Sequence, residues 1–566
     1  MRIVRLVLTC GIVAGVALPF SAQVKLDPAP AAERAAREGG QINERIRRES
    51  AQNSQVMKTL HYLADVYGPR LTGSPNHKAA AEWAVKTMTG WGMQNGKLEP
   101  WDFGAPGWTN EHLSVHAVAP FKDALVVEAL AWTPGTKGTV KAKAFNLIVP
   151  EGPLANADAD VAARGGRGPQ RLGPTEAELT AYLESVKSSV AGAAVLVGKG
   201  VMVPVNLAPA AGRMTDEQVR CRYDETAAND PACANQGRGG RGAPAPDRLT
   251  NAQVAQRIDA FLVAHKAALR VNDAGRAHGQ VIAFDNRTHD ITKAVPTVVM
   301  RNEDYGRIVR ILADGTPVEL EANIANTWYP EGKTSYNAVA EIAGTDKRDE
   351  VVMAGGHLDS WQSATGATDN AIGCAIMMEA ARILKALDVQ PRRTIRIALW
   401  SGEEQGLLGS QAYVKAHFGS AEAPTPEFAR FNGYLNIDTG TGRLRGASVF
   451  GPPEAAAALR TIFAPFADLK IAGATATTSR ATGGTDSTSF NNAGLPGIGF
   501  NQDPIEYGSH THHTNLDTYE RVIEQDVRDA SIVVAGALYE LAMRDEPLPR
   551  FTADKMPAKP AGRGSF

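Results

Sequence analysis

The chain has 566 residues and a formal net charge of −2 at pH 7. This length exceeds what one hydrophobic core supports, so we expect two or more domains. The near-neutral balance gives no reason to expect nucleic acid or an anionic membrane as a partner. Apolar residues make up 43% of the sequence, enough for a sizeable core. No internal run of about 18 apolar residues occurs, so no membrane span is expected in the mature protein.

The first residues have the features of a secretory signal peptide. Met1–Arg5 carries two arginines, and Leu6–Phe20 is an apolar stretch of suitable length. Small residues around Ala22 offer a cleavage point. We therefore expect export, to the periplasm or the extracellular space; an uncleaved anchor is the alternative.

Composition divides the chain into an α/β domain interrupted by a β-rich insert, with a short extension at each end. The predicted parts are a signal peptide (1–22), an N-terminal arm (23–54), the first part of the α/β domain (55–120), the insert (121–326), the second part of the α/β domain (327–545) and a disordered tail (546–566). The arm is charged and alanine-rich, which favours a helix or a partly ordered segment. The tail is rich in Pro, Lys and Gly.

Two helices open the α/β domain. The apolar residues between Met57 and Val66 keep a helical spacing until Gly68–Pro69 breaks it. Asn76–Met88 is predicted to form the second helix, and Leu113–Val118 alternates as a strand does.

The insert contains short β-like runs, such as Ala193–Val197 and Val295–Met300, and no constellation of catalytic residue types. Two short Gly/Arg patches within it are interpreted as flexible surface loops instead of RNA-binding segments. Cys221 and Cys233 flank a polar loop and can close a disulfide in an oxidising compartment. Outside the insert, Cys374 lies on the apolar face of a helix, which favours a buried free thiol.

In the second part of the α/β domain, the first candidate functional residues directly follow a strand. The apolar run from Val351 ends in two glycines and is followed at once by His357 and Asp359. Asp369 then precedes Ala371–Leu387, whose apolar spacing is helical. In a doubly wound sheet, ligands bind beyond the carboxyl ends of the strands. The sequence therefore predicts a site at this strand end.

The same arrangement recurs twice. The strand Ile395–Trp400 is followed by Glu403 and Glu404, and the strand Tyr434–Ile437 is followed by Asp438. A late loop adds three histidines, His510, His512 and His513. Imidazoles and carboxylates gathered at one sheet edge form a metal-site composition, and this nitrogen and oxygen ligand set suits zinc.

At these residues the sequence resembles peptidase family M28, a family of di-zinc peptidases that includes secreted aminopeptidases and carboxypeptidase Q-like enzymes. The matching motifs, in the family's order, are Tyr67–Ser74, Gly356–Ser360, Gly366–Gly373, Ser401–Ser410, Asn436–Asp438 and His513–Thr518. The resemblance covers roughly residues 55–118 and 335–543. Residues 121–326 resemble, more weakly, a protease-associated (PA) domain.

The resemblance implies a fold and a ligand set. The fold is an α/β/α sandwich with a mostly parallel, doubly wound sheet and an inserted PA-like domain. Two zinc ions are expected per chain, with peptides as substrate. The implied metal ligands are His357 and Asp438 for one zinc, Glu404 and His513 for the other, and Asp369 as the bridge between them.

The resemblance also implies catalytic and substrate residues. Glu403 would be the general base, and Asp359 would orient the imidazole of His357. Tyr507 is a candidate donor to the developing oxyanion, with packing at the core or rim as the alternative. Asp486 lies in a segment that looks like the family's substrate-pocket loop. His510 and His512 are interpreted as pocket or surface residues.

Physical chemistry supports this division of roles. A zinc pair roughly 3.5–4 Å apart needs a bridging carboxylate and open positions for water and substrate. A carboxylate that is not a ligand must still carry the proton to the leaving amine, a role worth ~10²–10⁴-fold in rate. The adjacent pair Glu403 and Glu404 supplies one carboxylate for each task.

The sequence thus predicts an exported di-zinc exopeptidase, and we favour an aminopeptidase. A carboxypeptidase or dipeptidase of the same family is the alternative within the enzymes, because nothing in the spacing shows which peptide end is held. A non-catalytic, receptor-like binding protein is the alternative from another class. The complete set of ligands, together with Glu403, argues against it.

Overall fold

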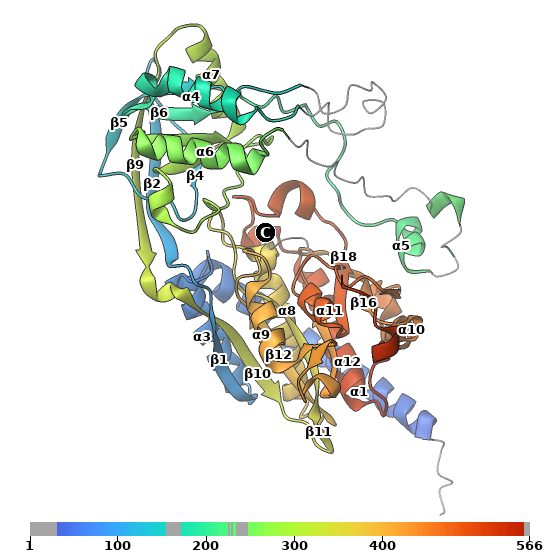
Figure 1. Cartoon of the computed structure of the whole chain (residues 1–566). Coiled ribbons are helices and arrows are strands. Elements are labelled where there is room, and N and C mark those ends of the chain that lie inside the picture. Colours follow the sequence, from blue (N-terminus) through green and yellow to red (C-terminus); the bar gives the residue numbers. More distant parts are fainter. Residues whose placement is uncertain (1–30, 154–170, 225–226, 228–229, 234–246, 560–566) are drawn as a thin grey trace, which may run out of the picture.

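The computed structural model describes residues 31–153, 171–224, 227, 230–233 and 247–559 (Figure 1). The predicted signal peptide and both Gly/Arg patches lie outside these residues. The described chain is built on two eight-stranded sheets. The lower sheet in Figure 1, here the main sheet, comes mostly from the second half of the chain, and the upper one is the insert sheet.

The main sheet has a parallel centre. Strands β12, β11, β15 and β18 run parallel as neighbours, whereas β1, β10 and β16 pair antiparallel toward the edges. In spatial order the strands are β1 (Gln94–Asp102), β10 (Thr334–Ile342), β12 (Arg393–Trp400), β11 (Lys347–His357), β15 (Phe431–Asn436), β18 (Gly497–Gln502), β16 (Leu444–Phe450) and β17 (Ala474–Thr477).

Helices cover both faces of this sheet because its strands are apolar on both sides. Val352 and Ala354 of β11 belong to one core, whereas Val351 and Met353 belong to the other, as the two-residue period of a strand requires. The first core includes residues of α1 (Ala31–Asn53), α2 (Val56–His61), α3 (Pro75–Gly90), α8 (Ile372–Ala386), α10 (Pro453–Phe463) and α12 (Glu524–Met543). The second includes residues of α9 (Leu408–His417) and α11 (Ser487–Ala493). The predicted α/β/α sandwich is confirmed.

Local sequence explains where key elements begin and end. The Ser74 hydroxyl accepts a hydrogen bond from the backbone N–H of His77, and Pro75 occupies the first helical position, so α3 starts there. Gly355, near the end of β11, lies so close to β12 that an added Cβ would fall 1.9 Å from the carbonyl oxygen of Ala398. Only glycine allows these two strands to pair at that point.

The insert sheet is also an α/β structure. Strands β5, β6, β7 and β8 run parallel, and a long antiparallel pair, β2 and β9, flanks them. In spatial order the strands are β3 (Asp123–Ala124), β2 (Gly107–Ala119), β9 (Glu319–Tyr329), β5 (Val140–Leu147), β6 (Ala194–Val197), β7 (Leu269–Asp273), β8 (Thr297–Met300) and β4 (Val127–Ala129). Helices α4 (Glu176–Val190), α6 (Asn251–Ala264) and α7 (Asn302–Ala313) pack on it. Its likeness to a PA domain stays a prediction.

The insert is larger than the sequence predicts. Both β2, from Gly107, and β9, to Tyr329, belong to the insert sheet, which therefore extends beyond the predicted insert of residues 121–326. The predicted strand Leu113–Val118 lies within β2 and so joins the insert sheet. Alternation identifies a strand without saying which sheet it joins, so the domain bounds stay a prediction.

One segment of the insert, which contains α5 (Asp216–Tyr223), extends away from the insert sheet and contacts the main domain. Figure 1 shows α5 near β16, away from the other helices of the insert. Arg213 forms ion pairs with Asp503 and Asp526 of the main domain. The predicted Cys221–Cys233 disulfide follows at once and is confirmed, and Cys374 is a buried free thiol.

Both ends of the described chain pack against the main domain. In α1, Ile46 is fully buried, and Glu49 forms an ion pair with Arg382 of α8. Within the tail predicted to be disordered, Leu548 is buried and the ring of Phe551 lies 5.3 Å from that of Phe450. Its polar composition conceals these two apolar anchors.

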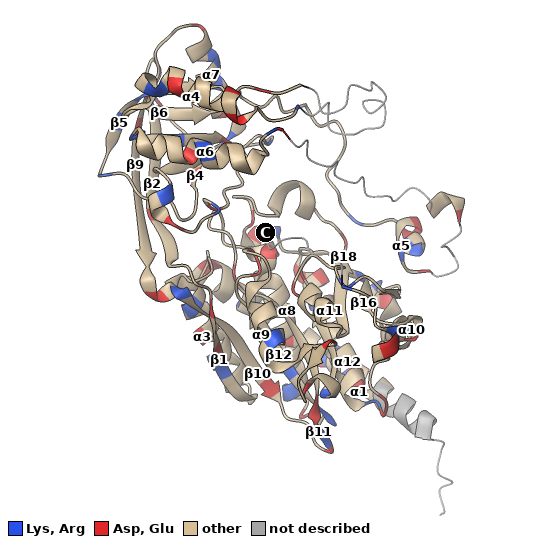
Figure 2. Ribbon diagram, viewed as in Figure 1, with Lys and Arg blue, Asp and Glu red and all other residues tan. Residues whose placement is uncertain are grey.

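Charge follows no large single-sign pattern. Figure 2 shows Lys and Arg interspersed with Asp and Glu over both parts of the molecule, in keeping with the net charge of −2. Within the residues described, no helix combines the length and apolar character needed to cross a membrane.

Candidate metal centre

Three neighbouring parallel strands deliver the predicted ligands to one edge of the main sheet. His357 is the last residue of β11 and lies level with Trp400, the last residue of β12. Gly355 of β11 lies level with Asn436, the last residue of β15. The residues that follow these strands therefore emerge together. They include Glu403, Glu404 and Asp438.

His357 faces two carboxylates. Its side chain is fully buried, and its Nε2 lies 3.2 Å from Oδ1 of Asp369 and 3.2 Å from Oδ1 of Asp438. Its Nδ1 lies 2.9 Å from the backbone carbonyl oxygen of Asp359 and donates to it. That hydrogen bond leaves Nε2 as the nitrogen that faces the carboxylates.

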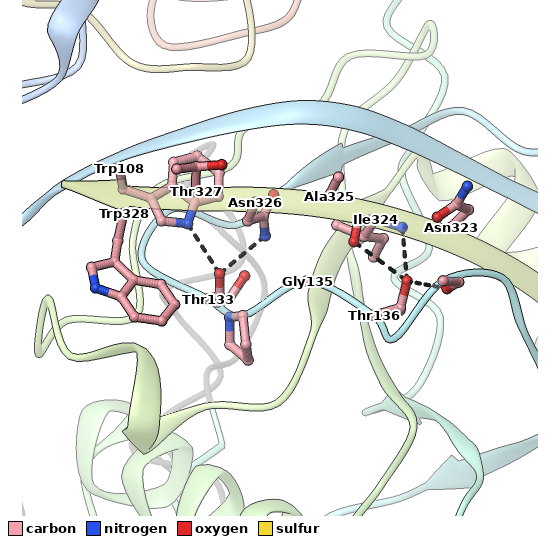
Figure 3. Close-up of a pocket in the computed structure, with 12 residues that line it drawn as sticks. Trp108, Thr133, Gly135, Thr136, Asn323, Ile324, Ala325, Asn326, Thr327 and Trp328 are labelled. Atoms are coloured by element: carbon pink, nitrogen blue, oxygen red, sulfur yellow. Dashed lines mark hydrogen bonds between the residues drawn. The ribbon is translucent and has the colours of Figure 1, made fainter.

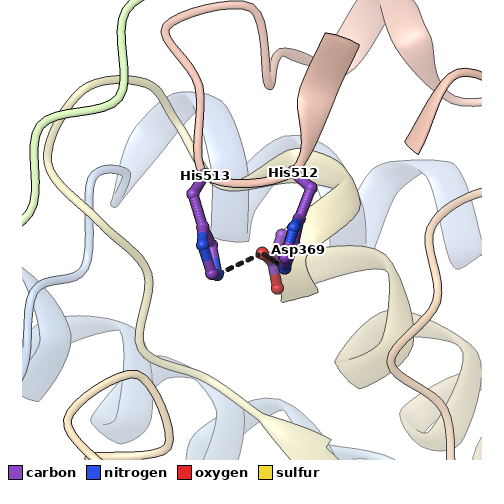
Figure 4. Close-up of side chains that lie close together, drawn as sticks. All are labelled: Asp369, His512 and His513. Atoms are coloured by element: carbon purple, nitrogen blue, oxygen red, sulfur yellow. Dashed lines mark ion pairs between the residues drawn. The ribbon is translucent and has the colours of Figure 1, made fainter. Parts of the chain in front are cut away.

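His513 faces the same Asp369 from the other side. Its Nε2 lies 3.2 Å from Oδ2 of Asp369 and 3.0 Å from Oε2 of Glu404. Asp369 thus directs one carboxylate oxygen toward each histidine. Figure 4 shows His512 and His513 side by side above Asp369, but Nε2 of His512 is farther from Oδ2, at 3.8 Å, and its side chain is 45% exposed.

The cluster fits a pair of divalent cations. Oδ2 of Asp369 and Oε1 of Glu404 are buried and accept no hydrogen bond, although Nε2 of His513 is near. Within the part of the chain that the structure describes, no Lys or Arg forms an ion pair with Asp369, Glu403, Glu404 or Asp438. Buried carboxylates that outnumber their cationic partners are costly, and a metal ion removes that cost. The donor set is the one that zinc prefers.

Burial and mutual repulsion dominate the electrostatics. Burial, followed by the neighbouring carboxylates, raises the pKa of Glu403 and of Glu404 well above the usual value. Burial alone would lower the pKa of His357, but the carboxylates of Asp438 and Glu403 outweigh it and raise that pKa. Without a cation these crowded carboxyl groups are driven to hold protons, and a bound cation would favour their charged forms.

Asp359 contacts His357 through its backbone, and its role in orienting that imidazole stays a prediction. Its carboxylate lies 3.8 Å from Nδ1 of His357, beyond hydrogen-bond distance, and its backbone carbonyl holds the ring instead. The carboxylate accepts the backbone N–H groups of Glu403 and Glu404, at 3.3 and 3.2 Å, and the hydroxyl of Thr72 at 3.0 Å. Asp359 therefore positions the turn that carries both glutamates as well as His357.

Two residues of the matching motifs, Asp517 and Arg70, support the site although the sequence indicates no role for them. The carboxylate of Asp517 accepts the N–H groups of Thr368 and Asp369, at 2.6 and 3.0 Å, and so fixes the backbone of the bridging residue. Arg70 is fully buried and donates to four carbonyl groups of the surrounding loops. Residue type alone does not distinguish such contacts from ordinary surface pairing.

The two predicted substrate residues occupy different environments. Tyr507 is half-buried, and its ring lies 4.8 Å from that of His512, at the rim of the cluster. Asp486 is fully buried, and its role in substrate binding stays a prediction. Burial raises the pKa of Asp486 to about 7, and its charge in turn raises the pKa of Glu403.

A separate cavity of about 450 Å³ lies on the β2–β9 pair of the insert (Figure 3). Its lining residues are Trp108, Thr133, Pro134, Gly135, Thr136, Gly138, Asn323, Ile324, Ala325, Asn326, Thr327 and Trp328. None of these side chains is an acid, a base, a nucleophilic thiol or an imidazole. This cavity therefore offers no side chain for acid–base or nucleophilic chemistry.

Comparisons with known proteins show what the chain resembles. Residues 337–537 match the sequence profile of peptidase family M28. Carboxypeptidase Q from Rattus norvegicus is 31% identical over 256 residues, which are 45% of this chain and 52% of the relative. Leupeptin-inactivating enzyme 1 from Streptomyces exfoliatus is 39% identical over 112 residues, which are 20% of this chain and 24% of the relative. The chain thus spans about half the length of the carboxypeptidase Q relatives, 52% for the rat protein.

Solved structures share the fold. A peptidase M28 precursor from Shewanella amazonensis SB2B superposes with a TM-score of 0.60 at 22% identity, covering 91% of this chain and 99% of that one. BSAP, a zinc aminopeptidase from Bacillus subtilis, superposes with a TM-score of 0.51 at 17% identity, covering 89% and 97%. At these identities the likeness establishes the architecture alone.

Proposed function

We propose that this chain is an exported zinc exopeptidase of peptidase family M28, and specifically an aminopeptidase; the match of residues 337–537 to that family supports the proposal. The observation that carries the proposal is the position of Asp369, whose two carboxylate oxygens face His357 and His513 at 3.2 Å each. A single carboxylate between two imidazoles is what a bridged metal pair requires.

The proposed ligands divide into two half-sites. His357 and Asp438 hold one zinc, Glu404 and His513 hold the other, and Asp369 belongs to both. A zinc pair bound there supplies a Lewis acid for the scissile carbonyl and a water whose pKa is lowered to about 7.

Glu403 is the proposed proton carrier. Its backbone N–H is held by Asp359, and its side chain is half-buried. Among the described residues, no ion pair joins its carboxylate to His357 or His513, whereas Glu404 lies 3.0 Å from Nε2 of His513. Glu403 is therefore the member of the pair that is left to take a proton from the attacking water and pass it to the leaving amine.

The remaining choice is between an aminopeptidase and a carboxypeptidase, and it depends on which end of the peptide the enzyme binds. The carboxylates around the cluster can receive the ammonium group of a free N-terminus, which supports an aminopeptidase. The 31% identity with carboxypeptidase Q supports a carboxypeptidase as the second candidate. Export is supported by the predicted signal peptide and by the Cys221–Cys233 disulfide.

Zinc analysis and a set of end-blocked peptides test the proposal together. We expect two zinc ions per chain by elemental analysis, loss of activity on chelation, and recovery on adding zinc or cobalt. Free peptides should be trimmed from the N-terminus, and N-acetylated ones should resist. Equal cleavage of N-acetylated peptides from the C-terminus would establish the carboxypeptidase, and activity in metal-free protein would refute the metal mechanism.

A further inference from the structure

The two candidate histidine ligands are held by different means. Nδ1 of His357 is fixed by a hydrogen bond to the carbonyl of Asp359. Nδ1 of His513 has no hydrogen-bond partner among the described residues, although its side chain is 78% removed from solvent, with 22% exposed. Ligating histidines almost always use the second ring nitrogen to fix their orientation. Among the described residues, contacts other than such a hydrogen bond therefore restrain the ring of His513.

The backbone of His513 does not supply the missing restraint. Its φ is +62°, in the left-handed region that non-glycine residues seldom adopt. Such a conformation persists only when surrounding contacts impose it. The neighbours of His513 must therefore hold the backbone and the ring together.

Besides the adjacent ring of His512, at 3.7 Å, two aromatic side chains lie against the imidazole. The ring of Phe284 lies 5.3 Å from that of His513, at an interplanar angle of 78°. Trp361 lies 6.5 Å away at 77°, and the rings of Phe284 and Trp361 contact each other at 5.0 Å. These are edge-to-face arrangements, which aromatic pairs favour.

Phe284 comes from the insert, between β7 and β8, whereas Trp361 and His513 belong to the main domain. Hydrogen bonds hold the Phe284 segment against the metal centre. The N–H of Val281 donates to Oδ1 of Asn515 at 2.9 Å, and the N–H of Asn515 donates to the carbonyl of Val281 at 3.0 Å. Nε2 of Gln362 donates to the carbonyl of Phe284 at 3.2 Å.

These hydrogen bonds lie next to the aromatic rings in sequence. Asn515 is two residues from His513, and Gln362 is next to Trp361.

Phe284 does little for the insert's own core. It remains 41% exposed, and it is not a member of the buried clusters of the insert sheet. An aromatic side chain left this exposed at a domain boundary, with its ring against a candidate ligand, points to a role at the site.

We propose that Phe284 is a positioning residue for His513, through which the insert completes the half-site of Glu404 and His513. The proposal rests on the proposed zinc function. The ring keeps the imidazole aimed at Glu404 and Asp369 in place of the hydrogen bond that Nδ1 lacks. The half-site of His357 and Asp438 needs no such help from the insert.

The test compares zinc release from Phe284→Ala, Phe284→Tyr and wild-type protein under graded chelator competition. The interaction energy of such an aromatic pair corresponds to a change in zinc affinity of about 3- to 10-fold. Phe284→Ala should therefore release one of its two zinc ions at about 3- to 10-fold lower chelator strength, with the other unchanged. Phe284→Tyr retains the ring and should behave as the wild type. Trp328→Ala, which removes an exposed aromatic elsewhere in the insert, is the matched control.

Kinetics at saturating zinc separate positioning from substrate contact. If Phe284 positions His513, kcat of Phe284→Ala should recover as zinc is added, and KM should stay near the wild-type value. A chelator curve identical to the wild type, with KM raised only for bulky peptides, would overturn the proposal. Wild-type protein that binds no zinc would instead refute the proposed function. Should Phe284→Ala fail to fold, Phe284→Leu keeps the volume without the aromatic ring and is predicted to release zinc as Phe284→Ala would.

Discussion

The two halves of the proposed metal centre are built from different parts of the molecule. His357 ends a central strand, is fully buried, and is fixed by a backbone carbonyl. Its partner Asp438 follows the neighbouring parallel strand. His513 lies on a loop, is 22% exposed, and takes its restraints from side chains, one of them from the insert. The first half-site depends on the sheet, whereas the second depends on packing between domains.

This difference predicts two zinc ions of unequal affinity. A ligand fixed by regular structure loses little freedom when metal binds, whereas a loop ligand must be ordered at that moment. We expect the zinc held by His357 and Asp438 to stay at chelator concentrations that remove the other. The following variants, from the largest expected effect to the smallest, test the distinction.

Asp369→Ala removes the side chain that both halves share. Both zinc ions should be lost together, and activity should fall to the background rate, because each half-site is left with two ligands. Elemental analysis alongside the peptide assay checks this. Asp438→Ala is the matched control and should remove the His357 zinc alone; retention of two ions in Asp369→Ala would contradict the bridge.

Glu403→Gln keeps the size of the side chain but cannot accept a proton. Both metals should remain, and kcat and kcat/KM should fall equally by ~10²–10⁴-fold, the loss expected for a general base. Glu404→Ala should instead lose zinc from the His513 half, with activity partly returning at high zinc. A metal-depleted Glu403→Gln would mean that the two roles are exchanged.

Asp359→Ala removes the carboxylate that accepts the N–H groups of Glu403 and Glu404, but it keeps the carbonyl that holds His357. Zinc affinity should therefore fall by ~10–100-fold in the Glu404 half, the range for lost supporting contacts, and little in the other half. Thr72→Val, which removes one hydrogen bond to the same carboxylate, should give a smaller loss in the same direction. Preferential loss of the His357 zinc would show that the carboxylate acts on that ring.

The double variant Cys221→Ser/Cys233→Ser should have the smallest effect on the metal centre. Removing a disulfide across a sequence separation of 12 should lower the free energy of unfolding of the region around α5 by about 2–3 kcal/mol, without changing zinc content. Thermal unfolding with zinc analysis checks this. Loss of one zinc would show that α5 supports the His513 loop more directly than its contacts suggest.

Sequence reasoning placed the strand ends well because apolar runs followed by His, Asp or Glu are local patterns. The bounds of β11, β12 and β15 differ from their predicted runs by at most a few residues. Contacts between distant residues could not be predicted in this way. The pattern around Asp359 is the same whether its carbonyl or its carboxylate meets His357, and nothing near Phe284 indicates a metal ligand more than two hundred residues later.

The insert also holds the His513 loop at both ends, and this has a consequence for the order of folding. Arg213 contacts Asp503 before the loop, and Val281 bonds Asn515 after it. Contacts this distant in sequence form late, because closing long loops is slow. The parallel strands can assemble the His357 half first, whereas the other half must wait until the insert docks. Refolding in zinc should therefore show two phases of metal uptake, and the slower one should report the joining of the two domains.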